Sequence, residues 1–95
     1  MDVKEAVAKA KTYVAEAFAG ESLRDLGLEE IRFEEESDAW LITLGFSRSW
    51  DAPKIVTNRL GRDLDLNRTY KTLRIADPDG RLLALDDRVP LMADG

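Results

Sequence analysis

Residues 31–46 alternate apolar and polar side chains on either side of a short polar segment. The large apolar residues are Ile31, Phe33, Trp40, Ile42, Leu44 and Phe46. Successive side chains of a β-strand point to opposite faces, so this spacing predicts two strands that share one apolar face. The polar segment Glu36-Ser37-Asp38 is typical of the turn between them.

Burial of the apolar face selects the register of this first hairpin. With Ser37 and Asp38 as the loop, the predicted pairs are Glu35–Trp40, Phe33–Ile42 and Ile31–Leu44. A slip by one residue would place Phe33 on the face opposite Ile42, and burial therefore disfavours it.

A second hairpin is predicted near the C-terminal end, around Asp77-Pro78-Asp79-Gly80. Proline at the second position and glycine at the fourth are typical of a type I turn, and Gly80 suits a following bulge. The predicted pairs are Asp77–Arg81, Ile75–Leu83 and Leu73–Leu85, which place the four apolar side chains on one face.

The N-terminal segment has helical periodicity. Apolar residues recur at steps of three and four, at Val3, Ala6, Val7, Ala10, Val14, Ala17 and Phe18. Asp2 followed by Glu5 predicts a capping box at the start of the helix, and Gly20 predicts a left-handed residue at its end. The alanines allow this helix to lie close to a sheet.

Residues 47–68 form the least regular part of the sequence, and we expect a long loop there with a short strand or a turn of helix in residues 55–60. A chain of 95 residues with no repeat or linker is expected to form a single domain, residues 1–95. The sequence therefore predicts an α+β fold in which one N-terminal helix packs on a four-stranded antiparallel sheet, in the order α-β-β-β-β with two hairpins.

Composition removes several classes of function. The chain has no cysteine and no histidine, which excludes disulfides, cysteine zinc sites and imidazole-based catalysis. No glycine-rich phosphate loop or pair of carboxylates in an apolar setting is recognisable, so we expect no enzyme activity and no cofactor. The absence of a secretory leader and of a long apolar run predicts a cytoplasmic protein without membrane contact.

Charge is unevenly distributed along the chain. Residues 1–46 carry 5 basic and 11 acidic groups, residues 47–74 carry 7 and 3, and residues 75–95 carry 2 and 5, so the three segments have net charges of −6, +4 and −3. The basic segment, with its aromatic residues, predicts a surface that binds a protein partner. The candidate residues are Arg48, Trp50, Lys54, Arg59, Arg62, Arg68 and Tyr70. In the alternative interpretation these charges only offset acidic neighbours, and Trp50 covers an edge of the core.

Two acidic clusters have competing interpretations. The run Glu34-Glu35-Glu36-Ser37-Asp38 suits a charged hairpin tip better than a cation site, because Glu34 and Glu35 point to opposite faces of a strand. The segment Asp77–Asp86 has partial calcium-loop spacing, but Ile75 would occupy the first ligand position. We interpret this segment as a turn.

Two segments resemble the PepSY-like and cystatin-like group of small domains. The later one is Tyr70-Lys71-Thr72-Leu73-Arg74-Ile75-Ala76-Asp77-Pro78-Asp79-Gly80-Arg81-Leu82-Leu83, and the earlier one is Trp40-Leu41-Ile42-Thr43-Leu44. That resemblance implies an antiparallel sheet curled around one helix and a non-catalytic role in inhibiting, chaperoning or regulating another protein. The inhibitory loop Gln-x-Val-x-Gly of cystatins is absent, so no inhibitory residues are transferred.

The expected function is therefore a non-enzymatic protein-interaction or regulatory module, either a monomer or a weak homodimer, whose partner is not identified. An antitoxin or immunity-type role is an alternative suggested by small size and acidity. RNA binding through residues 47–74 is a second alternative, although a pI near 4.7 makes a nucleic-acid partner less favourable.

Overall fold

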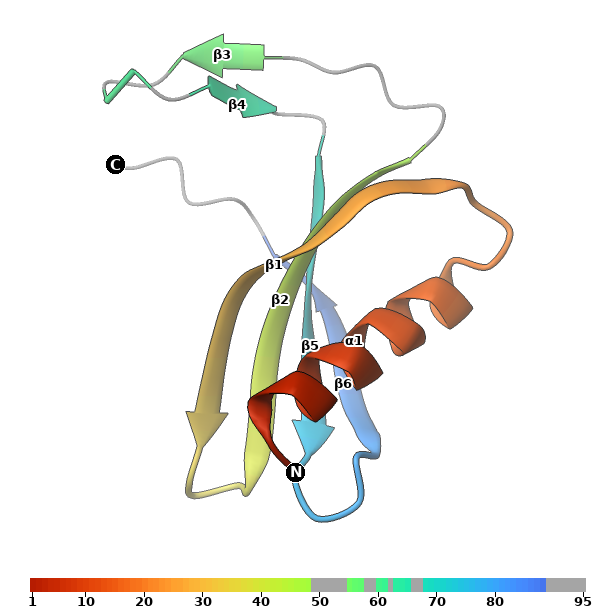
Figure 1. Cartoon of the computed structure of the whole chain (residues 1–95), viewed down its shortest axis with the longest axis vertical. Helices are drawn as coiled ribbons and strands as arrows, with labels where there is room; N and C mark the ends of the chain where they lie inside the picture. Colours follow the sequence, from red (N-terminus) through yellow and green to blue (C-terminus); the bar gives the residue numbers. More distant parts are fainter. Residues whose placement is uncertain (49–54, 58–59, 62, 66–67, 89–95) are drawn as a thin grey trace.

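A computed structural model of the chain describes residues 1–48, 55–57, 60–61, 63–65 and 68–88. Helix α1 spans Val3–Ala17 and covers one face of an antiparallel sheet with the strand order β1-β2-β5-β6 (Figure 1). The strands of this sheet are β1 (Leu23–Glu34), β2 (Ala39–Arg48), β5 (Thr69–Ala76) and β6 (Leu82–Asp87). The predicted α+β fold with one N-terminal helix on a four-stranded antiparallel sheet is confirmed.

Two further short strands lie in the segment expected to be a loop. β3 (Ile55–Thr57) pairs antiparallel with β4 (Asp63–Asp65), so the short strand expected within residues 55–60 is present. The expected loop is also shorter than predicted, because Ser47 and Arg48 belong to β2. In Figure 1 the β3–β4 pair lies beyond the end of the main sheet that is remote from the two hairpin turns.

The start of α1 agrees with the sequence, but its end does not. An Asp2 carboxylate oxygen accepts the backbone N–H of Glu5 at 2.8 Å, and the Glu5 side chain accepts the Asp2 N–H at 3.2 Å, which completes the predicted capping box. The helix ends at Ala17 with Phe18 as its C-cap, and Gly20 does not have a positive φ. The prediction of a left-handed Gly20 is therefore wrong.

The core lies between α1 and the two central strands. Ala6, Ala10 and Val14 are fully buried on the helix, and they pack with fully buried residues of β2 and β5, namely Ile42, Leu44, Phe46, Leu73 and Ile75. The small alanine side chains allow the helix to approach the sheet closely. Val3, at the edge of the predicted helical stripe, is 50% exposed and lies outside the core.

The first hairpin has a register that differs by two residues from the prediction. Phe33 pairs with Trp40 and Ile31 pairs with Ile42, because the turn contains the four residues 35–38. Asp38 has a φ of 54°, and its N–H donates to the carbonyl of Glu35 at 3.3 Å. Since the side-chain period of a strand is two, this shift leaves every apolar residue on the face that was predicted.

Strand β1 begins well before the alternating residues that predict it. It starts at Leu23 and contains two shifts of register, between Arg24 and Gly27 and between Leu28 and Glu30. Asp25, inside the first irregularity, has a φ of 55°. These bulges interrupt the period-two pattern, so the spacing of apolar residues does not predict a strand over residues 23–30.

The second hairpin also differs in detail. The Leu73–Leu85 pair is confirmed, but Ile75 pairs with Leu82 and not with Leu83. The backbone N–H of Ala76 donates to the carbonyl of Arg81 at 2.9 Å, so one extra residue must fit between Arg81 and Leu85. That residue is Leu83, which turns outward and is 43% exposed. Gly80, which suits a bulge, has a φ of 72°.

Candidate interaction surface

Three of the seven predicted partner-binding residues can be placed. They are Arg48, Arg68 and Tyr70. The other four, Trp50, Lys54, Arg59 and Arg62, lie outside the described residues. The three that can be placed all make contacts within the domain.

Arg68 binds the irregular part of strand β1. Arg68 immediately precedes β5, and its side chain reaches across β2 to β1. Its Nη2 donates to the carbonyl oxygen of Gly45 on β2 at 2.8 Å and to that of Asp25 on β1. Its Nε lies 3.9 Å from the Glu29 carboxylate, and its side chain is only 17% exposed. Arg68 therefore holds the bulged segment of β1 against the rest of the sheet.

Gly45 makes this arrangement possible. A Cβ atom at this position would lie 3.0 Å from Nε of Arg68, 3.0 Å from Cε1 of Tyr70 and 3.1 Å from a carboxylate oxygen of Glu29. The ring of Tyr70 thus packs over Gly45, and the carbonyl oxygen of Tyr70 accepts the N–H of Arg88 at 2.9 Å. Tyr70 is accordingly a half-buried part of the sheet.

Arg48 lies beside the end of the helix. Its guanidinium is 3.4 Å from Glu21 and 3.3 Å from the hydroxyl of Thr69, and it lies 5.8 Å from the ring centroid of Phe18. The ammonium of Lys71 lies 5.6 Å from the same ring. Since α1 has no basic residue in its last turn, these two cations supply positive charge near the carbonyl end of the helix, where it is favourable.

Each cation of the basic segment that the structure describes forms an ion pair within the fold. These four cations, Arg48, Arg68, Lys71 and Arg74, form ion pairs with Glu21, Glu29, Asp87 and Glu34 respectively. Three of these four carboxylates belong to the acidic segment of residues 1–46. For these residues the contacts favour the interpretation in which basic charges offset acidic neighbours.

Two of these pairs change the acidity of a carboxyl group. Hydrogen bonds from the Ser37 hydroxyl and from Arg74 lower the pKa of Glu34 below its ordinary value of 4.5. A hydrogen bond from Lys71 lowers the pKa of Asp87 below 3.8. Both carboxylates are thereby stabilised in the charged form.

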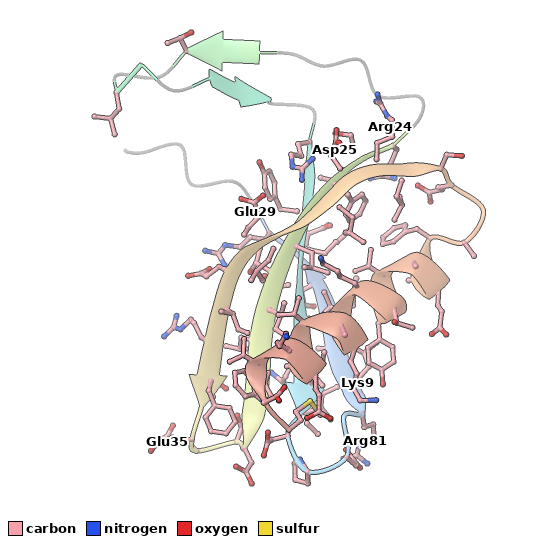
Figure 2. The ribbon with its side chains drawn as sticks, viewed as in Figure 1. Lys9, Arg24, Asp25, Glu29, Glu35 and Arg81 are labelled. Carbon is pink, nitrogen blue, oxygen red and sulfur yellow. The ribbon has the colours of Figure 1, made fainter. Side chains whose placement is uncertain are left out.

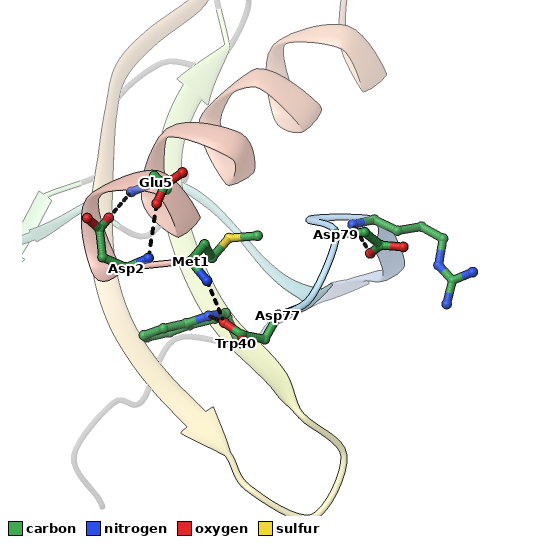
Figure 3. Close-up of polar contacts among 7 residues, drawn as sticks. Met1, Asp2, Glu5, Trp40, Asp77 and Asp79 are labelled. Atoms are coloured by element: carbon green, nitrogen blue, oxygen red, sulfur yellow. Dashed lines mark hydrogen bonds and ion pairs between the residues drawn. The ribbon is translucent and has the colours of Figure 1, made fainter.

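Asp77 joins the second hairpin to Met1, which precedes α1, and to Trp40 on β2 (Figure 3). One carboxylate oxygen accepts Nε1–H of Trp40 at 2.8 Å and the α-ammonium of Met1 at 3.1 Å. These hydrogen bonds, that from Trp40 foremost, lower the pKa of Asp77 below 3.8. The carboxylate of Asp79 accepts the backbone N–H of Arg81 at 3.0 Å. The Asp79 carboxylate thus supports the turn, and the Asp77 carboxylate ties it to the rest of the fold. No group of three potential metal ligands is found among the described residues.

The sheet face turned away from α1 carries a polar network. The hydroxyls of Thr43 and Thr72 lie 2.9 Å apart, and Thr43 is only 5% exposed. Arg88, which follows β6, crosses over them and forms an ion pair of 2.8 Å with Glu30 on β1. Three arginines on or next to β5 and β6 therefore hold three carboxylates of β1, those of Glu29, Glu30 and Glu34.

The outer edge of β1 has features of a binding surface. No strand pairs with this edge among the residues that the structure describes. On the helix side of the strand, Leu28 is 43% and Phe33 is 40% exposed, and the Phe33 ring stacks edge-on against Trp40 with 5.0 Å between centroids. Sequence periodicity assigned Phe33 to the apolar face but could not reveal that its strand lies at an edge.

The hairpin turn beside this edge is acidic, as expected. Figure 2 shows Glu35 at the free end of the hairpin, pointing away from the sheet. Glu36 is also exposed. Glu34, in contrast, is held by Arg74 on the sheet. The run from Glu34 to Asp38 therefore divides between a structural ion pair and a charged tip.

No family model, curated protein or solved structure matches this chain. The PepSY-like or cystatin-like likeness therefore stays a prediction. Within the described part of the chain, no helix is long and apolar enough to cross a membrane.

Proposed function

We propose that this protein is a non-enzymatic interaction module that binds an extended segment of another protein along the outer edge of β1. The observation that carries the proposal is the stretch Glu30–Glu34, which pairs with β2 without any shift of register. Such an edge presents a row of backbone N–H and C=O groups to an incoming strand. Main-chain hydrogen bonds then provide affinity, and the neighbouring side chains provide specificity.

Side-chain exposure supports β1 over the other edge strand. Phe33 and Leu28 offer apolar surface on the helix side of β1 that a bound segment would cover. β6 is shorter, contains the bulge at Leu83 and ends in two exposed aspartates. A docked strand therefore finds a longer regular edge and more apolar surface on β1.

The binding surface proposed on β1 lies outside the basic segment of residues 47–74. Arg48 and Arg68 each bind a carboxylate of the same chain, so recruiting them to a partner would break an existing ion pair. The same cost applies to RNA binding through residues 47–74. No contact among the described residues supports RNA binding. An antitoxin or immunity-type role is one form of the protein-binding function proposed, and a cytoplasmic location remains part of the proposal.

A capture experiment with matched variants tests the proposal. The full chain, a Phe33→Lys variant and a Leu83→Lys variant are used to retain proteins from extract of the source cells. Phe33 and Leu83 are similarly exposed, at 40% and 43%, but lie on opposite edges of the sheet. We expect Phe33→Lys to lose the retained partner and Leu83→Lys to keep it.

Leu28→Lys provides a second test, because Phe33 also supports Trp40 and its replacement could weaken the fold. Leu28 is 43% exposed and lies on the same strand. Thermal unfolding of each variant shows whether it is folded. Equal retention by all folded variants would overturn the proposal.

A further inference from the structure

The charges along the regular stretch of β1 follow a fixed pattern. Glu30, Arg32 and Glu34 lie on the sheet face turned away from α1, while Ile31 and Phe33 lie on the helix side. The side chains of Glu30 and Glu34 remain 42% and 38% exposed, and Arg32 is exposed. A strand docked on this edge would therefore meet acidic, basic and acidic side chains in turn on one face.

The internal ion pairs leave the two carboxylates able to bind further cations. Arg88 contacts Oε1 of Glu30, and both Arg74 and Ser37 contact Oε1 of Glu34. A carboxylate accepts hydrogen bonds through both oxygens, so Oε2 of each residue can accept a second donor. The exposed acidic tip at Glu35 and Glu36 adds negative potential beside this edge.

The same pattern disfavours a second copy of this chain as the occupant. Antiparallel self-pairing within residues 30–34 places Glu30 opposite Glu34 and Arg32 opposite Arg32, and like charges directly opposite are destabilising. Pairing centred on Ile31 would match Glu30 with Arg32, but it extends into the irregularity between Leu28 and Glu30. Charge thus opposes the first of these two registers, and the irregular geometry of β1 opposes the second.

From this pattern we infer that the partner segment is a strand with basic, apolar, acidic, apolar and basic residues in succession. This inference rests on the proposed function. The two basic side chains pair with Glu30 and Glu34, and the acidic one pairs with Arg32. The two apolar side chains cover Ile31 and Phe33 on the helix side. The charge order is the same in both chain directions, so it fits a parallel or an antiparallel strand.

Two synthetic peptides of equal length test the inference against the full chain. One contains the core Lys-Val-Glu-Val-Lys and the other the charge-inverted core Glu-Val-Lys-Val-Glu, each flanked by threonines. Three opposite-charge pairs replace three like-charge pairs, so we expect the first peptide to bind about tenfold more tightly by fluorescence anisotropy. The preference should shrink with added salt.

Substitution of Arg32 tests the central pair separately. We expect Arg32→Glu to reverse the preference between Lys-Val-Glu-Val-Lys and Lys-Val-Lys-Val-Lys, which differ only at the middle position, because the charge opposite that position is inverted. Arg81→Glu is the matched control, since Arg81 is also exposed but lies beside the other hairpin turn. It should leave the preference unchanged.

The outcomes separate the two proposals. Equal binding of both peptides, abolished in each case by Phe33→Lys, would overturn the charge pattern and retain docking on β1. If binding is unaffected by Phe33→Lys and by N-methylation of either set of alternate peptide N–H groups, both the charge pattern and docking on β1 are overturned. Both are also overturned if neither peptide binds. Sedimentation showing a dimer that Phe33→Lys dissociates would identify a second copy as the occupant and overturn the inference.

Discussion

Nη2 of Arg68 donates a hydrogen bond of 2.8 Å to the carbonyl oxygen of Gly45 on the neighbouring strand β2. The same guanidinium binds the carbonyl of Asp25 in the first bulge of β1, one strand further across the sheet. A residue expected to contact a partner is thus part of the internal support of the sheet.

Gly45→Ala should destabilise the protein by about 1–3 kcal/mol, since the added methyl group would overpack the site between Arg68 and Tyr70. Urea unfolding followed by circular dichroism measures the change. Gly20→Ala is the control, because a methyl group added there would meet nothing within 4 Å beyond its chain neighbours and the φ of Gly20 is not positive. A similar loss of stability in both variants would contradict this account of Gly45.

Arg68→Gln should lower the free energy of unfolding by about 1–3 kcal/mol, because carbonyl groups of β1 and β2 lose a charged donor. Arg32→Gln should change it by less than about 0.5 kcal/mol, since Arg32 is exposed and has no ion pair among the described residues. The two variants remove the same charge, so their difference in denaturant midpoint reports the contacts of Arg68. No difference would show that Arg68 does not support the sheet.

Ile42→Ala should destabilise the protein by roughly 2–5 kcal/mol, because a fully buried side chain is truncated between α1 and the sheet. For a domain of this size such a loss is a large part of the total stability. Leu83→Ala, at the exposed bulge of β6, should cost much less. Thermal unfolding of the two variants side by side tests where the core lies.

Stability should fall in acid because folding lowers the pKa values of Glu34, Asp77 and Asp87. Below the ordinary values of 4.5 for Glu and 3.8 for Asp, the unfolded chain takes up protons that the folded chain does not. The free energy of unfolding therefore decreases as pH falls through this range, and the full contribution is present above it.

Asp77→Asn should reduce this pH dependence, because the substituted side chain no longer titrates. Asp86→Asn serves as the control, since Asp86 is exposed and forms no ion pair within the described residues. Denaturant unfolding between about pH 3 and pH 6 compares the slopes. An unchanged slope in the Asp77 variant would contradict the assignment.

Local sequence patterns predict the class of fold and most of the residues of its core. Helical spacing at Ala6, Ala10 and Val14 and strand alternation at Ile42 and Leu44 are local consequences of backbone geometry, and these five residues are buried as expected. The capping box at Asp2 is equally local. These features need no knowledge of what lies across the fold.

The strand registers, the ion pairs and the exposed edge instead depend on contacts between segments far apart in the sequence. A shift of two residues leaves the apolar face unchanged, so alternation could exclude a slip by one but not the observed pairing of Phe33 with Trp40. Arg68 and Glu29 are far apart in sequence, and their pairing depends on β5 and β1 flanking β2. The exposure of Phe33 follows from the same strand order, because an outer edge exists only once the neighbours of each strand are known.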